Sequence, residues 1–208
     1  MSPPKSGGEQ VAFAAGRPSL ANMTEAQYLT GRLLLALPGM GDPRFDHAVI
    51  ALTQHDENGA FGLGIGEILS QTSFHDVLND LDIDPSAVPD RPVHCGGPVE
   101  PSRGFVLHSA DWREDATMDC GPMGMVSASL EVLRAIAESR GPSRWIMALG
   151  YAGWGAGQLD NEMRHHGWHA AGCHDGVLWD TPAEQRWTAA WRAEGIDPAL
   201  LAGQTGRA

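Results

Sequence analysis

The chain has 208 residues and a mass of 22.2 kDa, which suits one domain with a substantial hydrophobic core. Its formal net charge of -12 at pH 7 and its pI near 5.0 argue against binding to nucleic acid or anionic lipid, since both need a basic surface. Lys5 is the only lysine, so the domain has none for a Schiff base or for a GxxxxGK[ST] phosphate loop.

Cysteine spacing and hydropathy indicate the compartment. Cys95, Cys120 and Cys173 are odd in number, far apart and outside any CxxC motif, which is typical of a reduced protein. The sequence has no run of about 18 apolar residues, the length that a membrane span needs, and its N-terminal apolar patch is too short for a secretory signal. We therefore expect a cytoplasmic protein with no membrane partner, in which each cysteine is a small buried hydrophobic residue.

The composition divides the chain into three parts. Residues 1–27 are rich in Pro, Gly, Ser and Ala without a hydrophobic period, which predicts a disordered leader. A single domain is expected over residues 28–201, and residues 202–208 are expected to form a loose tail. The first strand of the domain is predicted at 33–37, where the apolar run LLLAL ends in a Pro- and Gly-rich loop.

A hairpin is predicted next, with strands at 48–53 and 60–65 joined through the segment HDENG. Asn58 and Gly59 are expected to supply the positive φ of a tight turn. Glycines recur at every second position along and just after the second strand, which predicts a bulge or a very close neighbouring element. These glycines are Gly62, Gly64 and Gly66.

An amphipathic helix is predicted at 73–81, where apolar residues recur at helical spacing and Ser73 and Asp76 can serve the first turn. A proline-rich connector, IDPSAVPDRP, follows. The segment VHCGGPVEPSRGFVLHS then predicts two strands joined as a hairpin through a Gly-Pro turn, with the second strand at 104–109.

Two short strands are predicted at 117–120 and 123–128, on either side of Gly121-Pro122. A helical stripe of apolar residues then begins at Leu130 and is expected to end at Gly141-Pro142.

The stretch WIMALGYAGWGAGQLDNEM predicts a buried strand at 145–149, a glycine-rich turn, and a helix that starts at Gln158. Leu159 and Met163 form an i, i+4 apolar pair on one face of that helix. The glycines in the turn imply that another element comes close to its backbone.

Two more strands are predicted at 168–171 and 177–179. A last helix is expected to begin with Thr181 as its cap, Pro182 in its first turn and Glu184 in a capping box. Trp187 and Trp191 follow at helical spacing and are predicted to be core anchors, and Gly195 ends the helix.

Five motifs stand in order between Tyr28 and Ile196: LTGRLLLALPGMGDPRFDHAVI, HDENGAFGLGI, GGPVEPSRGFVLHS, ALGYAGWGAGQLDNEM and WDTPAEQRW. Together they resemble the YqgE/AlgH family of bacterial proteins. The resemblance implies an α+β domain whose mixed, bifurcated β-sheet curls into a barrel-like core with about four helices packed against it. The chain departs from the family pattern at Gly66-Glu67, where an asparagine and a basic residue are usual, and at Cys95 before GGP.

The resemblance implies less about function, since AlgH proteins carry a transcriptional-regulator label but have no established reaction or agreed ligand. We expect a non-enzymatic regulatory module that binds an unidentified protein or small molecule, without a cofactor and without direct binding to nucleic acid. Its binding surface is expected to combine the glycine loops with polar and aromatic neighbours. These are Asp42, His55, Arg103, His108, Tyr151, Trp154, Gln158 and Glu162.

The alternative is an undescribed enzyme that acts on a small anionic substrate. In this hypothesis His55 or His108 is the general base and Glu162 is its companion carboxylate. His55 and Arg103 stand at predicted turns and are equally consistent with contacts to an anionic ligand and with turn stabilisation. The glycine-rich turn GYAGWGAG is a weaker candidate for a nucleotide loop, because it matches neither GxGxxG nor GxxxxGK.

Two further groups contain reactive residue types without the spacing that chemistry needs. The run HHGWHAAGCHD holds zinc-ligand types, but Gly167 would interrupt a helix that aligned them. Its weak candidates for metal ligands are His165, His169, Cys173 and His174, beside His166. His108, Ser109 and Asp111 are the residue types of a hydrolase triad, but His108 and Ser109 point to opposite faces of an extended strand.

Overall fold

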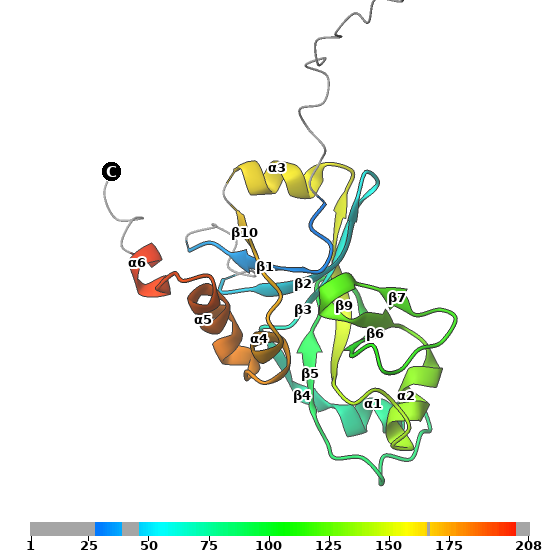
Figure 1. The fold of residues 1–208 in the computed structure, drawn as a ribbon. Coiled ribbons are helices and arrows are strands. Elements are labelled where there is room, and N and C mark those ends of the chain that lie inside the picture. The colour runs from blue at the N-terminus through cyan, green and yellow to red at the C-terminus, as the bar shows by residue number, and fades with distance from the viewer. Residues whose placement is uncertain (1–27, 39–45, 166, 203–208) are drawn as a thin grey trace, which may run out of the picture.

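The computed structural model describes residues 28–38, 46–165 and 167–202. These ranges hold a single mixed sheet of ten strands, six α-helices and a short 3-10 helix, η3, at Gly121–Met123 (Figure 1). The predicted leader and Asp42 lie outside the described residues. None of the described helices has the length and apolar character that a membrane span needs.

The upper part of the sheet is antiparallel. Its strands stand in the order β10 (Trp168–Ala171), β1 (Arg32–Ala36), β2 (Val49–Asp56) and β3 (Gly59–Gly64). β3 then pairs with the C-terminal part of β9 (Trp145–Gly155), which connects the upper part to the rest of the sheet.

The lower part of the sheet is built on both sides of β9. On one side stand β6 (Val99–His108), β8 (Met125–Ser127) and β7 (Met118–Asp119), all antiparallel to their neighbours. On the other side β5 (Pro92–Cys95) runs parallel to β9, and β4 (Ile68–Ser73) is antiparallel to β5.

β9 is the strand at which the sheet divides. Its residues 147–149 pair with β5, whereas its residues 152–155 pair with β3 on the same side. Gly150, with a φ of 75°, lies between these two segments. The predicted mixed, bifurcated and curled sheet is therefore confirmed, and one strand carries both branches.

The helices cover the sheet from three directions (Figure 1). α3 (Gln158–Arg164) crosses the top, and α1 (Phe74–Asp80) and α2 (Leu130–Ala137) cover the lower part. The other three lie together along the opposite side: α4 (Asp175–Trp179), α5 (Ala183–Ala193) and α6 (Pro198–Ala202). The described chain thus has more helices than the four or so expected, because α4 and α6 have only five residues each and left no periodic pattern.

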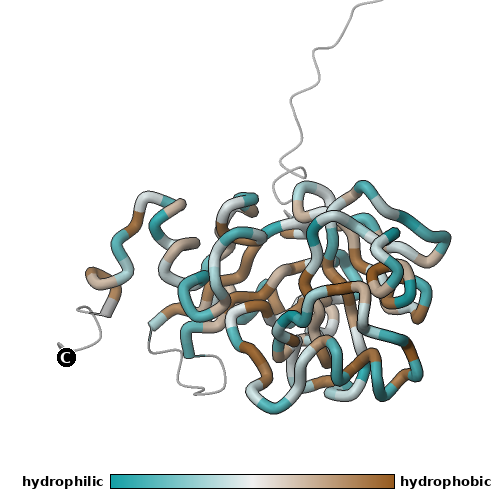
Figure 2. Tube along the Cα trace, turned by 90° about the horizontal axis from the view of Figure 1, so that it is seen from below, coloured by the Kyte–Doolittle hydropathy of each residue, from teal (hydrophilic) through white to brown (hydrophobic). Residues whose placement is uncertain are grey.

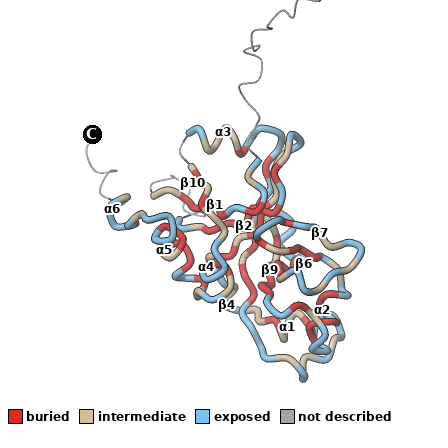
Figure 3. Tube along the Cα trace, viewed as in Figure 1, coloured by how far each residue is buried: buried red, intermediate tan, exposed pale blue. Residues whose placement is uncertain are grey.

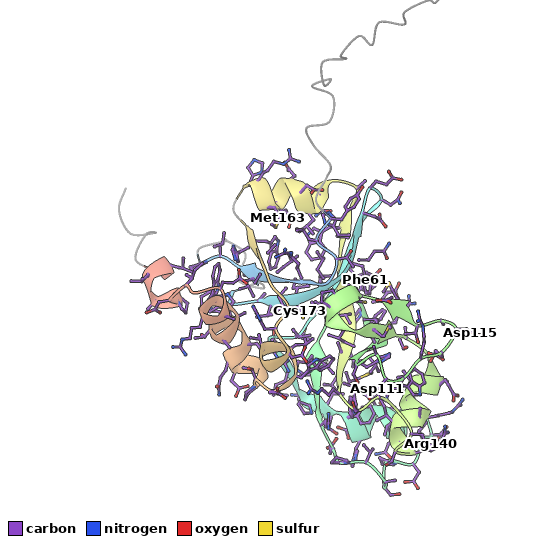
Figure 4. All side chains as sticks on the ribbon, viewed as in Figure 1. Phe61, Asp111, Asp115, Arg140, Met163 and Cys173 are labelled. Carbon is purple, nitrogen blue, oxygen red and sulfur yellow. The ribbon has the colours of Figure 1, made fainter. Side chains whose placement is uncertain are left out.

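Apolar side chains form three buried clusters, one beneath each group of helices, and Figure 3 shows the buried residues concentrated along the strands. In Figure 2, many of the hydrophilic segments lie on the outer turns. Trp187 and Trp191 are 7% and 1% exposed, which confirms that both are core anchors. Leu159 is buried and Met163 is half-buried against the same cluster, with Met163 beneath α3 in Figure 4.

Several local predictions are confirmed in detail. β2 and β3 form the expected hairpin, with a bulge between Leu52 and Gln54. Ser73 caps α1 in a capping box with Asp76. In the hairpin turn only Gly59 has a positive φ, of 142°, so the expectation that Asn58 shares it is wrong.

The largest correction concerns the segment predicted as a glycine-rich turn. β9 is a strand of 11 residues that continues through Tyr151 and Trp154 to Gly155. The turn into α3 is only Ala156-Gly157, and Gly157 has a φ of 68°. The glycines were mistaken for a turn because they weaken strand propensity, whereas here they allow close approach of neighbouring strands.

Three other predictions are also wrong. β5 and β6 do not form a hairpin, because they flank opposite sides of β9. Residues 177–179 belong to α4, not to a strand. The Thr181 hydroxyl donates to the Gly176 carbonyl, 2.7 Å away, and Pro182 occupies the cap position of α5.

The connection between β5 and β6 crosses the middle of β9 with almost no space between the backbones. A Cβ at Gly96 would stand 2.1 Å from the Gly150 carbonyl oxygen, and one at Gly97 would stand 2.2 Å from the Tyr151 carbonyl carbon. Gly97 also has a φ of 149°. Only glycine satisfies both constraints without displacing β9.

We predict that Gly97→Ala lowers the free energy of unfolding by about 3 kcal/mol or more, since it adds a backbone clash to an unfavourable φ. Gly155→Ala is the matched control, because the nearest atom to its Cβ would be 3.9 Å away. It should change stability by less than about 1 kcal/mol. Chemical denaturation of both variants measures the difference, and equal effects would contradict the crossing constraint.

Candidate functional site

A cavity of about 800 Å³ opens where the two branches of the sheet separate. Because Trp187 of α5 forms part of its wall, we call it the Trp187 cavity. The other walls come from the start of β2, the end of β3, the connection between β5 and β6, and the middle of β9. Its lining residues are Asp46, His47, Ala48, Val49, Ile50, Gly64, Gly66, Glu67, Cys95, Gly96, Gly97, Pro98, Pro101, Ala152, Ala183, Glu184, Trp187 and Thr188.

Backbone hydrogen bonds hold the strand walls of the cavity together. The Gly64 amide donates to the Gly96 carbonyl at 2.7 Å, and the Gly96 amide donates to Leu149 at 2.8 Å. The amide of Ile65 donates to Val49 at 2.9 Å. β2, β3, β5 and β9 are thus fixed relative to one another at the cavity, without any side chain being needed.

Two buried side chains attach α5 to these strands. The Trp187 indole donates to the Ala36 carbonyl at 2.9 Å. The Arg186 guanidinium donates to the Ile65 carbonyl at 2.6 Å and approaches Nε2 of His94 at 2.9 Å. These bonds join α5 to β1, to β5 and to the end of β3. The helix wall and the strand walls of the cavity are therefore held in place relative to each other, and the cavity is preformed.

His94 serves as a neutral acceptor in this arrangement. Its Nδ1 faces the Met147 carbonyl at 3.3 Å and must donate to it, so Nε2 is free to accept from Arg186. Burial, reinforced by the Arg186 charge, lowers the pKa of His94 to about 4. Burial also lowers the pKa of Arg186, to about 10, so Arg186 stays charged at neutral pH.

Three carboxylates stand around the Trp187 cavity, on Asp46, Glu67 and Glu184, and all three residues are exposed. His47 also lines the cavity, and its Nδ1 lies 2.9 Å from Asp46 Oδ1. No arginine or lysine is among the described residues that line the cavity. The described lining of the cavity is therefore acidic.

Cys95 is the described lining residue that places a thiol in the cavity wall. Partial burial raises the pKa of its thiol, and the negative charge of Glu67 raises it further. Burial likewise raises the pKa of Cys120 to about 12 and that of Cys173 to about 11. All three thiols therefore remain protonated at neutral pH, and none has the lowered pKa of a nucleophilic cysteine.

The predicted site residues Trp154, Gln158 and Glu162 do come together, but at α3, to which Gln158 and Glu162 belong, and not in the cavity. Glu162 Oε2 accepts from the indole nitrogens of Trp154, at 2.9 Å, and Trp168, at 3.0 Å. Its other oxygen accepts from the Gln158 amide at 3.0 Å. Gln158 in turn accepts from the Gly155 backbone amide. Glu162 thus ties α3 to β9 and β10, which is a structural role.

His55 also lies next to α3. It is 4% exposed, its Nδ1 accepts from the Leu29 amide at 3.2 Å, and its Nε2 lies 3.5 Å from the carboxylate of Asp160. The carboxylate next to His55 is therefore that of Asp160 and not that of Glu162. Asp56, at the end of the hairpin, accepts from the Asn58 amide at 2.7 Å and so stabilises the turn.

Tyr151 and Arg103 lie near a third group, an aromatic cluster on the opposite face of β9. The ring of Phe61 lies 4.7 Å from Tyr151 and 5.3 Å from Phe105 between centroids, and Figure 4 shows Phe61 near the middle of the molecule. The Arg103 guanidinium covers Phe105 and pairs with Glu100 at 3.0 Å. Both predicted site residues therefore make contacts within the protein, and neither lines the Trp187 cavity.

His108 is fully buried at the lower end of the sheet. Its Nδ1 donates to the Ser109 carbonyl, and its Nε2 contacts the Ser127 hydroxyl at 3.1 Å. Ser109 instead donates to Asp111 at 2.6 Å, so the triad types of the sequence do not assemble. His108 stands opposite Trp145, whereas Glu162 bonds Trp154 at the other end of β9, so these two cannot act as a catalytic pair.

The histidine-rich run is spread over three elements, the end of α3, β10 and the start of α4. His165 lies at the end of α3 and contacts the Asn161 carbonyl. His169 and His174 both approach Glu194, at 3.7 and 3.9 Å, and His169 stacks on Trp191. Cys173 packs against the core near α5, and His166 lies outside the described residues. No three such side chains of the described chain are grouped so that they would hold a metal ion.

None of the seven described residues predicted to bind lines the Trp187 cavity. Four of them lie at or next to α3: His55, Trp154, Gln158 and Glu162. Tyr151 and Arg103 lie at the aromatic cluster, and His108 is buried away from both groups. All five quoted motifs supply residues that line the cavity, and this shared position is the signal in the sequence that points to it.

We predict that Glu162→Ala lowers the free energy of unfolding by about 3 kcal/mol, because three donors lose a charged acceptor at once. The indole N–H resonances of Trp154 and Trp168 should move together. Glu131→Ala removes an exposed carboxylate from the first turn of α2 and should cost about 1 kcal/mol or less. A Glu162 variant as stable as this control would refute the structural role.

Because the pKa of His94 is lowered in the folded protein, we predict that the free energy of unfolding decreases in acid. Its folded pKa of about 4 lies below the ordinary value of 6.5, so between these values the unfolded chain binds a proton that the folded protein does not. Stability therefore falls as the pH drops through this window, by about 2 to 3 kcal/mol for this residue. His94→Gln should show a correspondingly smaller loss between pH 7 and pH 4.5 in urea denaturation. Identical losses in both proteins would contradict the assignment.

Comparison with known proteins places the chain in a family. A family profile described as AlgH-like matches residues 33–199. A UPF0301 protein of Novosphingobium aromaticivorans is 60% identical over 89% of this chain and 100% of its own length. A UPF0301 protein of Rhizorhabdus wittichii is 53% identical over 86% of this chain and 97% of its own.

Two solved structures share the fold. The solution structure of the AlgH protein from Pseudomonas aeruginosa is 37% identical, with a TM-score of 0.72, over 89% of this chain and 98% of its own. A protein of Corynebacterium diphtheriae, at 21% identity and a TM-score of 0.67 over 88% of this chain and 95% of its own, agrees in fold alone. The extent of the sequence match over residues 33–199 shows that the chain belongs to the AlgH-like family.

Proposed function

We propose that this protein is a non-enzymatic, cytoplasmic regulatory module that binds a small molecule in the Trp187 cavity. The observation that carries the proposal is the cavity itself, about 800 Å³ in volume. Ligand sites of proteins commonly measure about 300 to 1,000 Å³, with mostly apolar walls and a few polar groups. The mixture of Val49, Ile50 and Trp187 with rim carboxylates fits that description.

The rigidity of the walls supports binding without a large rearrangement. β2, β3, β5 and β9 are joined by backbone hydrogen bonds at the cavity, and α5 is attached through Arg186 and Trp187. A site that is already formed loses less conformational freedom when its ligand enters, so more of the contact energy appears as affinity.

The chemistry of the nearby groups supports binding over catalysis. The Cys95 thiol at the cavity has a raised pKa, so it is a poor nucleophile at neutral pH. The His108–Ser127 pair has the contacts of a catalytic dyad, but both residues are almost completely buried and neither lines the cavity. A nucleophile needs access to its substrate.

The regulatory part of the proposal follows the AlgH-like membership and the charge of the chain. A net charge of -12 disfavours direct contact with nucleic acid, so a regulatory effect would pass through a bound ligand or a protein partner. The three free cysteines support a reducing, cytoplasmic setting.

We predict that small soluble fragments, screened against the ¹⁵N-labelled protein, shift the Trp187 indole N–H and the amides of Gly66 and Ala152. Thr188→Phe should abolish these shifts, because the larger side chain fills the cavity from α5. Gln185→Phe is the matched control, since Gln185 is exposed on the same helix and does not line the cavity.

The wild-type pattern should survive in the Gln185 variant. Fragment-induced shifts that avoid these three reporters, or that persist unchanged in a folded Thr188 variant, would place the binding elsewhere and refute the proposal.

A further inference from the structure

We infer that the ligand of the Trp187 cavity is a small organic cation, with an apolar body that enters the cavity and a positively charged group that stays at its rim. The inference rests on the proposed function and adds the chemical class of the ligand. It stands on the separation of apolar and acidic groups around the cavity.

The deep wall suits an apolar body. Val49, Ile50 and Ala152 are between 1% and 4% exposed, and Trp187 is 7% exposed. The indole nitrogen of Trp187 is already bonded to the Ala36 carbonyl, so the indole has no free donor to offer a ligand. An aromatic or aliphatic group that covers this wall would remove apolar surface from water.

The rim suits a positive charge. Asp46 stands before β2, Glu67 follows β3, and Glu184 is in the first turn of α5, so carboxylates approach the cavity from three separate segments. All three residues are exposed, and the described lining holds no lysine or arginine. Asp46 contacts His47 at 2.9 Å, and the charge of Glu184 also acts on the buried Arg186. A cation placed between the three carboxylates would be attracted from more than one side.

The buried Arg186 favours one orientation of such a ligand, with its positive group at the rim and its apolar body inside the cavity. Its guanidinium lies behind the wall, bound to the Ile65 carbonyl and His94, and does not line the cavity. A second positive charge deep in the cavity would meet repulsion from Arg186 and lose its hydration. The ammonium group is therefore favoured at the rim, where water and the carboxylates of Asp46, Glu67 and Glu184 stabilise it.

An anionic ligand meets the opposite situation. It would approach a protein of net charge -12 and then pass the same three carboxylates. His47 is the one histidine of the described lining, and its ring contacts Asp46, at 2.9 Å, and Trp187, at 4.4 Å between centroids. The small anionic substrate of the enzyme hypothesis finds no support in this geometry.

Three probes of nearly equal shape test the inference: phenethylamine, 2-phenylethanol and 3-phenylpropanoate, which carry charges of +1, 0 and -1. Each is titrated into the ¹⁵N-labelled protein while the Trp187 indole N–H is followed. We expect the amine to bind about 10-fold more tightly than the alcohol, equivalent to about 1.4 kcal/mol, and the carboxylate to bind more weakly than the alcohol. Raising the ionic strength should reduce the difference.

The variant that tests the cause combines Asp46→Asn, Glu67→Gln and Glu184→Gln. It should lower the affinity for the amine to that of the alcohol and leave the affinity for the alcohol unchanged. The control combines Asp115→Asn, Glu131→Gln and Glu138→Gln, which changes the net charge equally at exposed positions away from the cavity. It should keep the preference for the amine.

The outcomes separate this inference from the proposed function. Equal binding of the three probes, tightest binding of the carboxylate, or an amine preference that survives the triple rim variant would overturn the cation assignment and leave a binding cavity in place. Failure of these probes, together with fragment shifts that ignore Thr188→Phe, would overturn the binding module as well. The salt dependence is measured on the wild-type protein, so the inference stays testable if the rim variant does not fold.

Discussion

The fold depends on three stretches of backbone that touch where the sheet divides. Gly64 of β3 and Gly96-Gly97 after β5 pack directly against each other and against Gly150 and Tyr151 of β9, at distances that leave no room for a Cβ. Hydrogen bonds from the Gly64 and Gly96 amides cross the same point. Because the contact is between main chains, it fixes the angle between the two branches of the sheet. The Trp187 cavity lies directly on this crossing, so the same glycines that allow the fold also line the site.

The helix wall of the cavity depends on a different kind of contact. The Arg186 side chain of α5 points into the protein, where a backbone carbonyl and a neutral imidazole, and not a carboxylate, accept hydrogen bonds from its guanidinium. Burying a cation is costly, and here only Nη1 of the guanidinium makes the two described contacts at the junction of β3 and β5, while the buried Nε has no hydrogen-bond partner. One side of α5 is therefore fixed in the protein, while Glu184 and Thr188 on another side face the cavity.

Local patterns in the sequence predicted most elements but not the site. The β2–β3 hairpin, the capped α1 and the tryptophan pair of α5 were predictable because each depends on neighbouring residues. The extent of β9 and the separation of β5 from β6 were not, because glycines that serve distant backbones resemble turn residues. Among the residues predicted to contact a ligand, Glu162 accepts hydrogen bonds from two indoles and Tyr151 packs on Phe61, and neither lines the cavity. The cavity arises from segments far apart in the chain, and no local spacing encodes it.

The position of β9 in the sheet has a consequence for how the protein is made. Before β9 leaves the ribosome, β1–β3, β4–β5 and β6–β8 lack the strand that pairs with all three groups, and among the described backbone contacts only the hydrogen bond from Gly64 to Gly96 joins β3 directly to the end of β5. Strands β3, β5 and β6 each keep an unpaired edge until residue 145 and beyond have been synthesised. Pairings between such distant segments form slowly, and exposed strand edges favour association with other chains. The nascent chain is therefore most exposed to aggregation, and most in need of chaperones, in the interval just before its central strand arrives.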